Sequence, residues 1–176
     1  MVVFVTGKPD SGKSKIAEDR AVQMAEGDLY YLATMKICDE EGKRRVEKHR
    51  LQRAGKGFVT IECLYEIRQV IGRLRSPAKS TVLLECIPNL VANEMFENPD
   101  RSFPTADGVE AFLEPLYKEI CGMAKEIGNL VIVSAEYDAV STKGEKATDA
   151  ETAIYLSAIS AMNRRLTDLA DEVVRT

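Results

Sequence analysis

The chain has 176 residues, of which 45% are hydrophobic and 30% charged, and its formal net charge is −4. This length and balance predict one domain with a hydrophobic core, and the negative charge argues against general affinity for nucleic acid. No apolar run approaches the ~20 residues of a membrane span. The four cysteines show no C-x-x-C spacing and there is one histidine, which argues against a zinc site. Scattered cysteines without a signal peptide predict free thiols and a cytoplasmic protein.

Strands and helices are predicted to alternate along the chain. The predicted strands are Val2–Thr6, Leu29–Ala33, Phe58–Ile61, Thr81–Glu85, Leu130–Ser134 and Glu172–Arg175. The predicted helices are Lys15–Glu26, the second half of 35–52, Leu64–Leu74, Pro88–Phe96, Val109–Ile127 and Asp149–Leu169. This alternation predicts a P-loop NTPase-like α/β fold, with a mostly parallel sheet covered by helices on both faces. Residues 1–176 are expected to form a single nucleotide-binding domain, with its site at the carboxyl ends of the strands.

A phosphate-binding loop is predicted directly after the first strand, where the chain matches G-x-x-x-x-G-K-[ST]. Its glycines let the backbone curl around phosphates, and the next helix presents free N–H groups and its positive dipole end. Lys13 would act on the β- and γ-phosphates, and the Ser14 hydroxyl would bind Mg²⁺. The flanking strand and helix favour this interpretation over a chance glycine-rich turn. The predicted nucleotide contacts of the loop are Gly7, Lys8, Pro9, Asp10, Ser11, Gly12, Lys13 and Ser14.

Glu85 ends the apolar strand that begins at Thr81, as the acidic residue of a Walker B strand does. A carboxylate at this position would hold the Mg²⁺ that Ser14 also contacts. The alternative is an ordinary exposed acid at a strand end, and aspartate is the usual residue in a Walker B strand.

His49 is the only histidine, and it lies in the segment 43–53 with six basic residues and one acid. Two interpretations of this segment stay open from composition alone. The first is a solvated, charged helix face. The second is a nucleophile, because a neutral imidazole can attack phosphorus while neighbouring Arg and Lys neutralise the developing charge.

Taken together, the sequence resembles the adenosylcobinamide kinase / adenosylcobinamide-phosphate guanylyltransferase (CobU) family over nearly its whole length. The residues that carry the resemblance are Val5-Thr6-Gly7, Ser11-Gly12-Lys13-Ser14, Ala17-Glu18, Tyr31-Leu32-Ala33-Thr34, Asp39-Glu40, Arg45-Val46, His49-Arg50, Arg53, Thr60-Ile61-Glu62, Val82-Leu83-Leu84-Glu85-Cys86, Asn93, Asn163-Arg164-Arg165-Leu166 and Ala170-Asp171-Glu172-Val173.

The resemblance implies two reactions with Mg²⁺. A kinase step uses a nucleoside triphosphate, ATP or GTP, to phosphorylate the aminopropanol hydroxyl of adenosylcobinamide. A guanylyl transfer from GTP then proceeds through His49 and releases pyrophosphate, so His49 and Lys13 are the predicted catalytic residues. Further implied nucleotide contacts are Ala33, Thr34, Met35, Arg53, Glu62 and Glu85. Similar proteins are trimers, which implies a homo-oligomer here.

The chain departs from the family pattern in several places. The family's N-E-V-G-x-G-I-V-P turn is replaced in 136–147, where only Glu136 survives. Lys8 and Ala54 replace a common Gly and Pro, and relatives continue beyond Thr176 with a final strand. These departures concern the corrinoid more than the nucleotide, and we expect the 136–147 loop to govern the second substrate. A P-loop kinase or NTPase with another alcohol substrate, or a catalytically silent nucleotide-binding regulatory protein, are the alternatives. Retention of His49 argues against the last.

Overall fold

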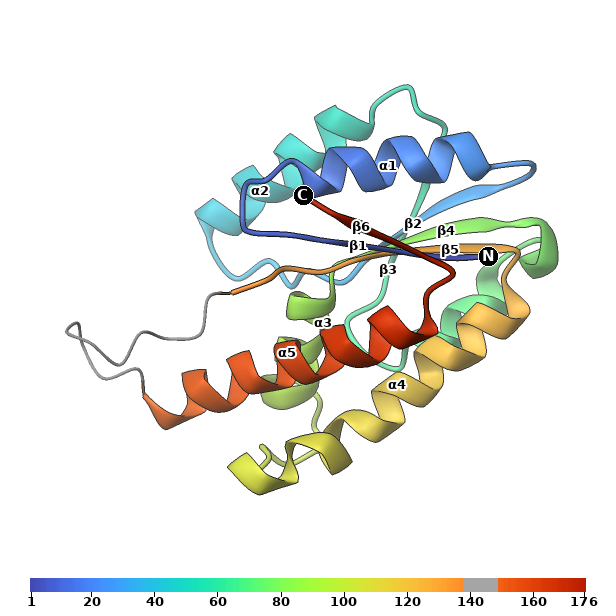
Figure 1. Ribbon diagram of the computed structural model, residues 1–176. Helices are drawn as coiled ribbons and strands as arrows, with labels where there is room; N and C mark the ends of the chain where they lie inside the picture. Colours follow the sequence, from blue (N-terminus) through green and yellow to red (C-terminus); the bar gives the residue numbers. More distant parts are fainter. Residues whose placement is uncertain (138–148) are drawn as a thin grey trace.

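The computed structural model describes residues 1–137 and 149–176, without the side chain of Arg45. Six strands form one sheet in the order β3-β2-β4-β5-β1-β6, and all five strand pairs are parallel (Figure 1). The strands are β1 (Val2–Thr6), β2 (Leu29–Ala33), β3 (Val59–Glu62), β4 (Thr81–Glu85), β5 (Asn129–Val133) and β6 (Glu172–Arg175). The predicted P-loop-type α/β fold is therefore confirmed, whereas the prediction for residues 138–147 lies outside the described part of the chain.

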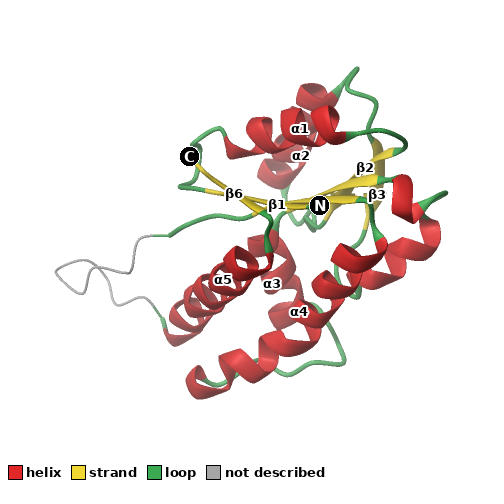
Figure 2. Cartoon of the chain, turned by 45° about the vertical axis from the view of Figure 1, so that its right-hand side comes forward, coloured by secondary structure: helices red, strands yellow, loops and turns green. Residues whose placement is uncertain are grey.

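Helices cover both faces of the sheet, as predicted (Figures 1 and 2). One face carries α1 (Lys13–Met24) and α2 (Glu40–Arg53), and the other carries α3 (Ile87–Phe96), α4 (Val109–Glu126) and α5 (Ala150–Leu169). Successive strand residues point to opposite faces, so each face has its own core. Val3 and Val5 pack with Ala17 of α1, whereas Phe4 packs in the larger core beneath the sheet.

The same alternation sets the direction of Glu85. Leu83 lies in the core on the α1 side, and Glu85 follows it by two residues on β4, so its side chain faces α1 and α2. The parallel register also pairs Ala33 at the end of β2 with both Glu62 and Glu85. The ends of β2, β3 and β4 therefore lie at one edge of the sheet.

Most predicted elements begin and end within two residues of the observed ones, but one prediction was wrong in type. The segment 64–74 was expected to be an amphipathic α-helix, and instead Ile67–Arg73 forms a 3₁₀ helix. Its buried residues are Ile67 and Val70, and their spacing of three matches the three residues per turn of a 3₁₀ helix. Glu66 precedes them in the left-handed conformation, with φ of 53°.

Two helix starts also matter for the site. The first helix begins at Lys13 and not at Lys15, so Lys13 and Ser14 belong to its first turn. The charged segment after β2 becomes helical only at Glu40, where the Asp39 side chain accepts a hydrogen bond from the Gly42 N–H at 2.7 Å. An aspartate N-cap of this kind satisfies one of the free N–H groups of the first turn. Within residues 1–137 and 149–176, no helix combines the length and apolarity needed to cross a membrane.

Asn93 of α3 ties two strand ends to the helix layer. Its buried side-chain amide donates to the carbonyl oxygens of Thr34, at 2.6 Å, and Leu64, at 2.8 Å.

We expect Asn93→Ala to lower the free energy of unfolding by about 1–3 kcal/mol, because two carbonyl groups lose their donor. Urea unfolding measures the change, with Asn89→Ala on the same helix as control. Equal stability of both variants would contradict this role.

Candidate active site

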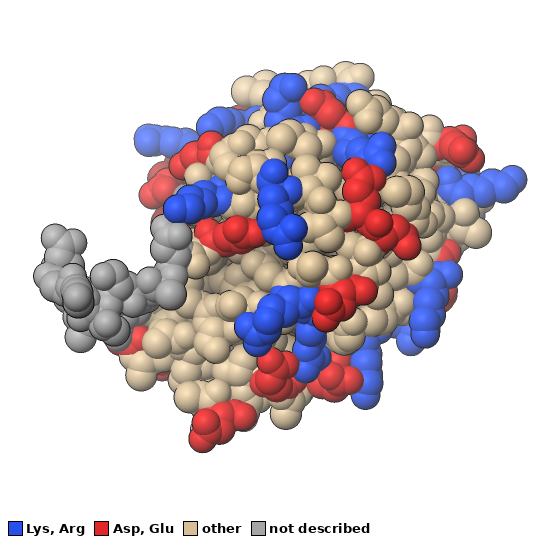
Figure 3. Space-filling view, viewed as in Figure 1, with Lys and Arg blue, Asp and Glu red and all other residues tan. Residues whose placement is uncertain are grey.

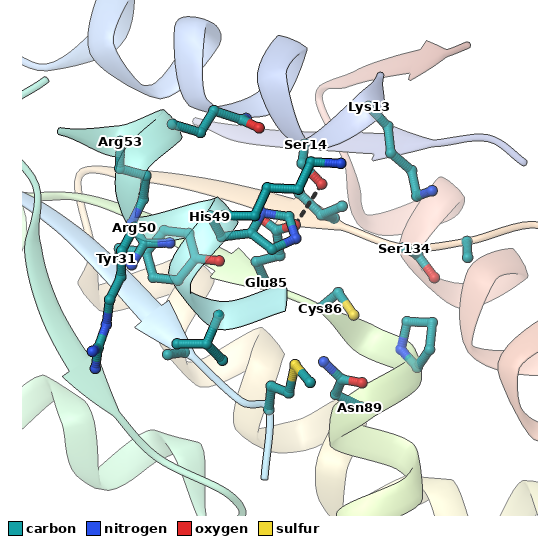
Figure 4. A pocket seen from close by; sticks show the side chains of 18 of the residues that line it. Lys13, Ser14, Tyr31, His49, Arg50, Arg53, Glu85, Cys86, Asn89 and Ser134 are labelled. Carbon is teal, nitrogen blue, oxygen red and sulfur yellow. Dashed lines mark hydrogen bonds between the residues drawn. The ribbon is translucent and has the colours of Figure 1, made fainter. Parts of the chain in front are cut away.

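A cavity of about 1080 Å³ opens at the carboxyl ends of the strands. Its walls come from the phosphate loop, α2 and the ends of β2, β4 and β5 (Figure 4). Open parallel sheets bind ligands at this edge. The predicted site residues that line the cavity are Pro9, Asp10, Gly12, Lys13, Ser14, Ala33, Met35, His49, Arg53, Glu62 and Glu85.

The phosphate loop has the backbone geometry that its glycines predict. Gly12 has φ of 83° and precedes the first residue of α1, so a side chain at this position would be strained. Gly7 is required for a different reason, since a Cβ there would lie 2.2 Å from Thr176 Oγ1. The Ser11 hydroxyl also lies 2.5 Å from that oxygen. Lys13 donates from Nζ to the Lys8 carbonyl oxygen at 2.9 Å, which holds its charge over the loop.

Ser14 and Glu85 meet at the centre of the site. The Ser14 hydroxyl donates to Oε1 of Glu85 at 2.5 Å, which joins the first turn of α1 to the end of β4 (Figure 4). Burial raises the pKa of the Glu85 carboxyl, while the Ser14 hydrogen bond and the nearby His49 oppose the change. The second oxygen, Oε2, is buried and has no partner at hydrogen-bond geometry, although the nearby Tyr31 side chain also acts to lower the pKa of this carboxyl. The Ser14 hydroxyl and the Glu85 Oε1 that it contacts are oxygen ligands of the kind that suit Mg²⁺.

Thr34 was predicted to contact the nucleotide, but it does not line the cavity. Its side chain instead connects the end of β2 to the end of β4. Its hydroxyl donates to the carbonyl oxygen of Glu85 at 3.0 Å and accepts from the Cys86 N–H at 2.9 Å. The Thr34 N–H also donates to the Glu85 carbonyl oxygen. Thr34 thus fixes the backbone that carries Glu85, whereas Ala33 and Met35 on either side face the cavity.

His49 points from α2 into the cavity toward Glu85 and Ser14 (Figure 4). The residue is half-buried, and its Nδ1 is buried without a hydrogen-bond partner. This placement differs from a solvated charged helix face. Four residues along α2, Arg53 is 8% exposed, and its guanidinium carbon lies 3.5 Å from the centre of the Tyr31 ring. This cation–π contact holds the end of α2 against the sheet.

Glu62 and Arg50 lie on the exposed side of the cavity. Their side chains are 74% and 54% exposed, and Arg50 Nη2 lies 3.6 Å from Glu62 Oε1. An exposed ion pair of this kind stabilises the fold by about 0–1 kcal/mol. Both side chains line the cavity, so they are available to a ligand.

Glu18 was not predicted as a site residue, although it faces the same place. It follows Ser14 by four residues on α1, so the two share one helix face, and it is fully buried. Lys56 Nζ lies 2.9 Å from Glu18 Oε2 and 2.8 Å from Asp19 Oδ1. The signal in the sequence was the four-residue spacing from the phosphate-loop serine.

The surface charge is mixed on the face drawn in Figure 3, where Lys and Arg alternate with Asp and Glu. At the cavity itself, cations gather from the first turn of α1 and from α2. They are Lys13, Lys15, Arg44, Lys48, Arg50 and Arg53. A polyanion such as a nucleoside triphosphate suits such a lining.

The sheet order and the loop after β1 define the chain as a P-loop NTPase-like α/β protein. A family model described as cobinamide kinase / cobinamide phosphate guanyltransferase (CobU) matches residues 3–176, and the chain belongs to this family. A relative, the bifunctional adenosylcobalamin biosynthesis protein CobU of Escherichia coli (strain K12), is 32% identical over 120 residues. That match spans 68% of this chain and 64% of the relative's length. Among solved structures, flagellar accessory protein FlaH from Methanocaldococcus jannaschii aligns with a TM-score of 0.44 and 12% identity, over 99% of this chain and 70% of that one.

Lys13 provides the first test of the site. We expect Lys13→Ala to weaken GTP binding more than about tenfold, because a charge-assisted hydrogen bond to phosphate contributes roughly 1.5–3 kcal/mol. The fold should persist, since Lys13 bonds only to a loop carbonyl in the described structure. Calorimetry compares it with Lys15→Ala, a neighbouring cation that pairs with Asp19. Equal losses in both variants would show that only overall charge matters.

Glu85 provides a test through pH. Burial raises its pKa above the ordinary 4.5, so the folded state binds this proton more tightly than the unfolded chain. The stability it contributes is complete below pH 4.5 and is lost as the pH rises through the folded-state pKa. Glu85→Gln stays neutral, and we expect it to raise the Tm of the ligand-free protein at pH 8 and to change it little at pH 4.

Thermal scans in EDTA measure this difference, with the exposed Glu126→Gln as control. A lower Tm at pH 8, or the same shift at both pH values, would contradict the burial argument.

Proposed function

We propose that the chain is a bifunctional cobinamide enzyme. It phosphorylates the aminopropanol hydroxyl of adenosylcobinamide with a nucleoside triphosphate, and it transfers GMP from GTP to the phosphorylated product through His49. The observation that carries this proposal is the position of His49, whose imidazole enters the cavity that the phosphate loop also lines (Figure 4). Membership of the CobU family supports the same assignment.

The phosphate loop and its lysine bind the triphosphate in this proposal. Backbone N–H groups at the start of α1 point to the phosphates, and Lys13 adds a positive charge. Ser14 and Glu85 are the residues that would hold Mg²⁺, and a bound Mg²⁺ would supply positive charge toward the phosphates. Thr34 keeps Glu85 in place through the hydrogen bonds between the ends of β2 and β4.

His49 carries the transfer of GMP. A neutral imidazole nitrogen attacks the α-phosphorus of GTP, a P–N bond forms, and the P–O bond to the β-phosphate breaks as pyrophosphate leaves. The phosphate of adenosylcobinamide phosphate then attacks the same phosphorus, the P–N bond breaks, and His49 returns to its starting form. Arg50 and Arg53 line the cavity and stabilise the charge on the transferring phosphates.

The size of the cavity supports a second substrate beside the nucleotide. Its volume of about 1080 Å³ slightly exceeds the ~300–1,000 Å³ of common ligand pockets. Asn89 of α3 and Tyr155 of α5 line the cavity from the other face of the sheet. We assign the corrinoid arm to these residues. We also propose that residues 1–176 act as one nucleotide-binding domain. A cytoplasmic location and a homo-oligomer, a trimer as in similar proteins, stay predictions from the sequence.

Labelling with α-³²P-GTP tests the proposal. We expect the wild-type protein to gain a covalent label that is labile in acid and stable in base, as a P–N bond is, and His49→Ala to gain none. Lys43→Ala, an exposed α2 cation that pairs with Glu40, serves as the matched control and should keep the label. Turnover of the γ-phosphate without label would instead indicate a P-loop kinase or NTPase with another alcohol substrate. Binding without either reaction would indicate a regulatory protein.

A further inference from the structure

Three residues that meet near the start of α1 each have a buried polar atom without a hydrogen-bond partner. These atoms are Oε1 of Glu18, Nδ1 of His49 and Oε2 of Glu85. These residues come from α1, α2 and β4, and each offers a donor atom within 4.8 Å of those of the other two. Buried polar groups normally have partners, so three unsatisfied side chains at one place indicate a missing ligand.

The rest of each carboxylate is held by the protein. Lys56 Nζ contacts Oε2 of Glu18 at 2.9 Å, and the Ser14 hydroxyl donates to Oε1 of Glu85 at 2.5 Å. Glu18 is fully buried and Glu85 is 9% exposed, so neither spare oxygen can turn easily to water. One oxygen of each carboxylate is thus held by a protein side chain, and the other is left to bind a ligand. Metal-binding carboxylates are commonly oriented by hydrogen bonds of this kind.

The spacing fits a metal ion. Three atoms within 4.8 Å of one another lie at most about 2.8 Å from a common centre. Zn²⁺ binds imidazole and carboxylate at about 2.0–2.2 Å, so inward movements of under about 1 Å complete the site. Two carboxylates and an imidazole suit transition ions, whereas Mg²⁺ prefers oxygen ligands and retains its waters. The sequence argued against zinc from its cysteine spacing and its single histidine, whereas this site needs no cysteine and combines that one histidine with two carboxylates.

We propose that Glu18, His49 and Glu85 bind a divalent transition-metal ion, Zn²⁺, in the nucleotide-free protein. This site differs from the Mg²⁺ position at Ser14, because it uses the other oxygen of Glu85 together with the His49 imidazole. One consequence rests on the proposed function. A metal-bound imidazole has lost the lone pair used in attack on phosphorus, so Zn²⁺ inhibits guanylylation and a chelator restores it.

Direct binding to the nucleotide-free full chain tests the site. Calorimetry with Zn²⁺ should show one site per chain, and Glu18→Gln and His49→Gln should each weaken it at least tenfold. Asp19→Asn is the matched control, since Asp19 is the next residue on α1 and also contacts Lys56 but lies outside the cluster. A Cys38→Ser background removes the exposed thiol. If Glu18→Gln does not fold, the Zn²⁺ affinity of His49→Gln still tests the site, because His49 lies on the more exposed helix α2.

Spectroscopy identifies the ligands. Co²⁺ in place of Zn²⁺ should give d–d bands without a thiolate charge-transfer band. A thiolate band would place the ion on a cysteine, such as Cys86 beside the cavity, and would overturn the proposal. So would the absence of binding or an unchanged affinity in Glu18→Gln.

The metal site and the proposed function fail separately. Zn²⁺ binding without any GTP label supports the site and contradicts the transfer mechanism. A GTP label without Zn²⁺ binding supports the transfer mechanism and contradicts the metal site.

Discussion

The hydrogen bond between Ser14 and Glu85 is the contact on which the site depends. It joins residues 71 positions apart, and it exists because parallel pairing of β1 with β5 and of β5 with β4 brings the loop beside the end of β4. The carboxylate lies on the α1 side because side chains alternate along a strand. A shift of one residue in the register of β4 would turn Glu85 to the other face and remove the acid from the site.

The helix that carries His49 is held differently. Of the α2 residues whose burial is described, only Gly42 and Arg53 are buried, so hydrophobic packing contributes little to its position. Its start is fixed by the Asp39 cap, and its end by the Arg53 guanidinium stacked on Tyr31. A helix fixed at its ends by polar contacts can adjust its position more easily than one packed in a core. This freedom is consistent with the proposed role of His49, in which the imidazole approaches two substrates in turn.

The parts of the site that follow from the sequence are those with a local signal. The phosphate loop has its glycine and lysine spacing, and Glu85 ends a run of buried residues whose period of two also sets its direction. The direction of His49 had no such signal, because α2 lacks an apolar stripe that would orient it. Glu18 looked like one more charged helix residue, and its burial depends on Lys56, which lies 38 positions away. The 3₁₀ helix at Ile67–Arg73 was missed because its short apolar pattern fits either helix type.

The buried carboxylates of the cavity lower the stability of the ligand-free fold. Glu18 and Glu85 are buried, and removing carboxylates from water costs several kcal/mol per ion unless partners compensate. Lys56 compensates Glu18, whereas Glu85 receives a hydroxyl hydrogen bond and has a raised pKa. The ligand-free site is therefore destabilising, and the sheet offsets that cost. Any cation that binds these oxygens relieves the cost in the folded state alone, so metal binding and stability are necessarily linked.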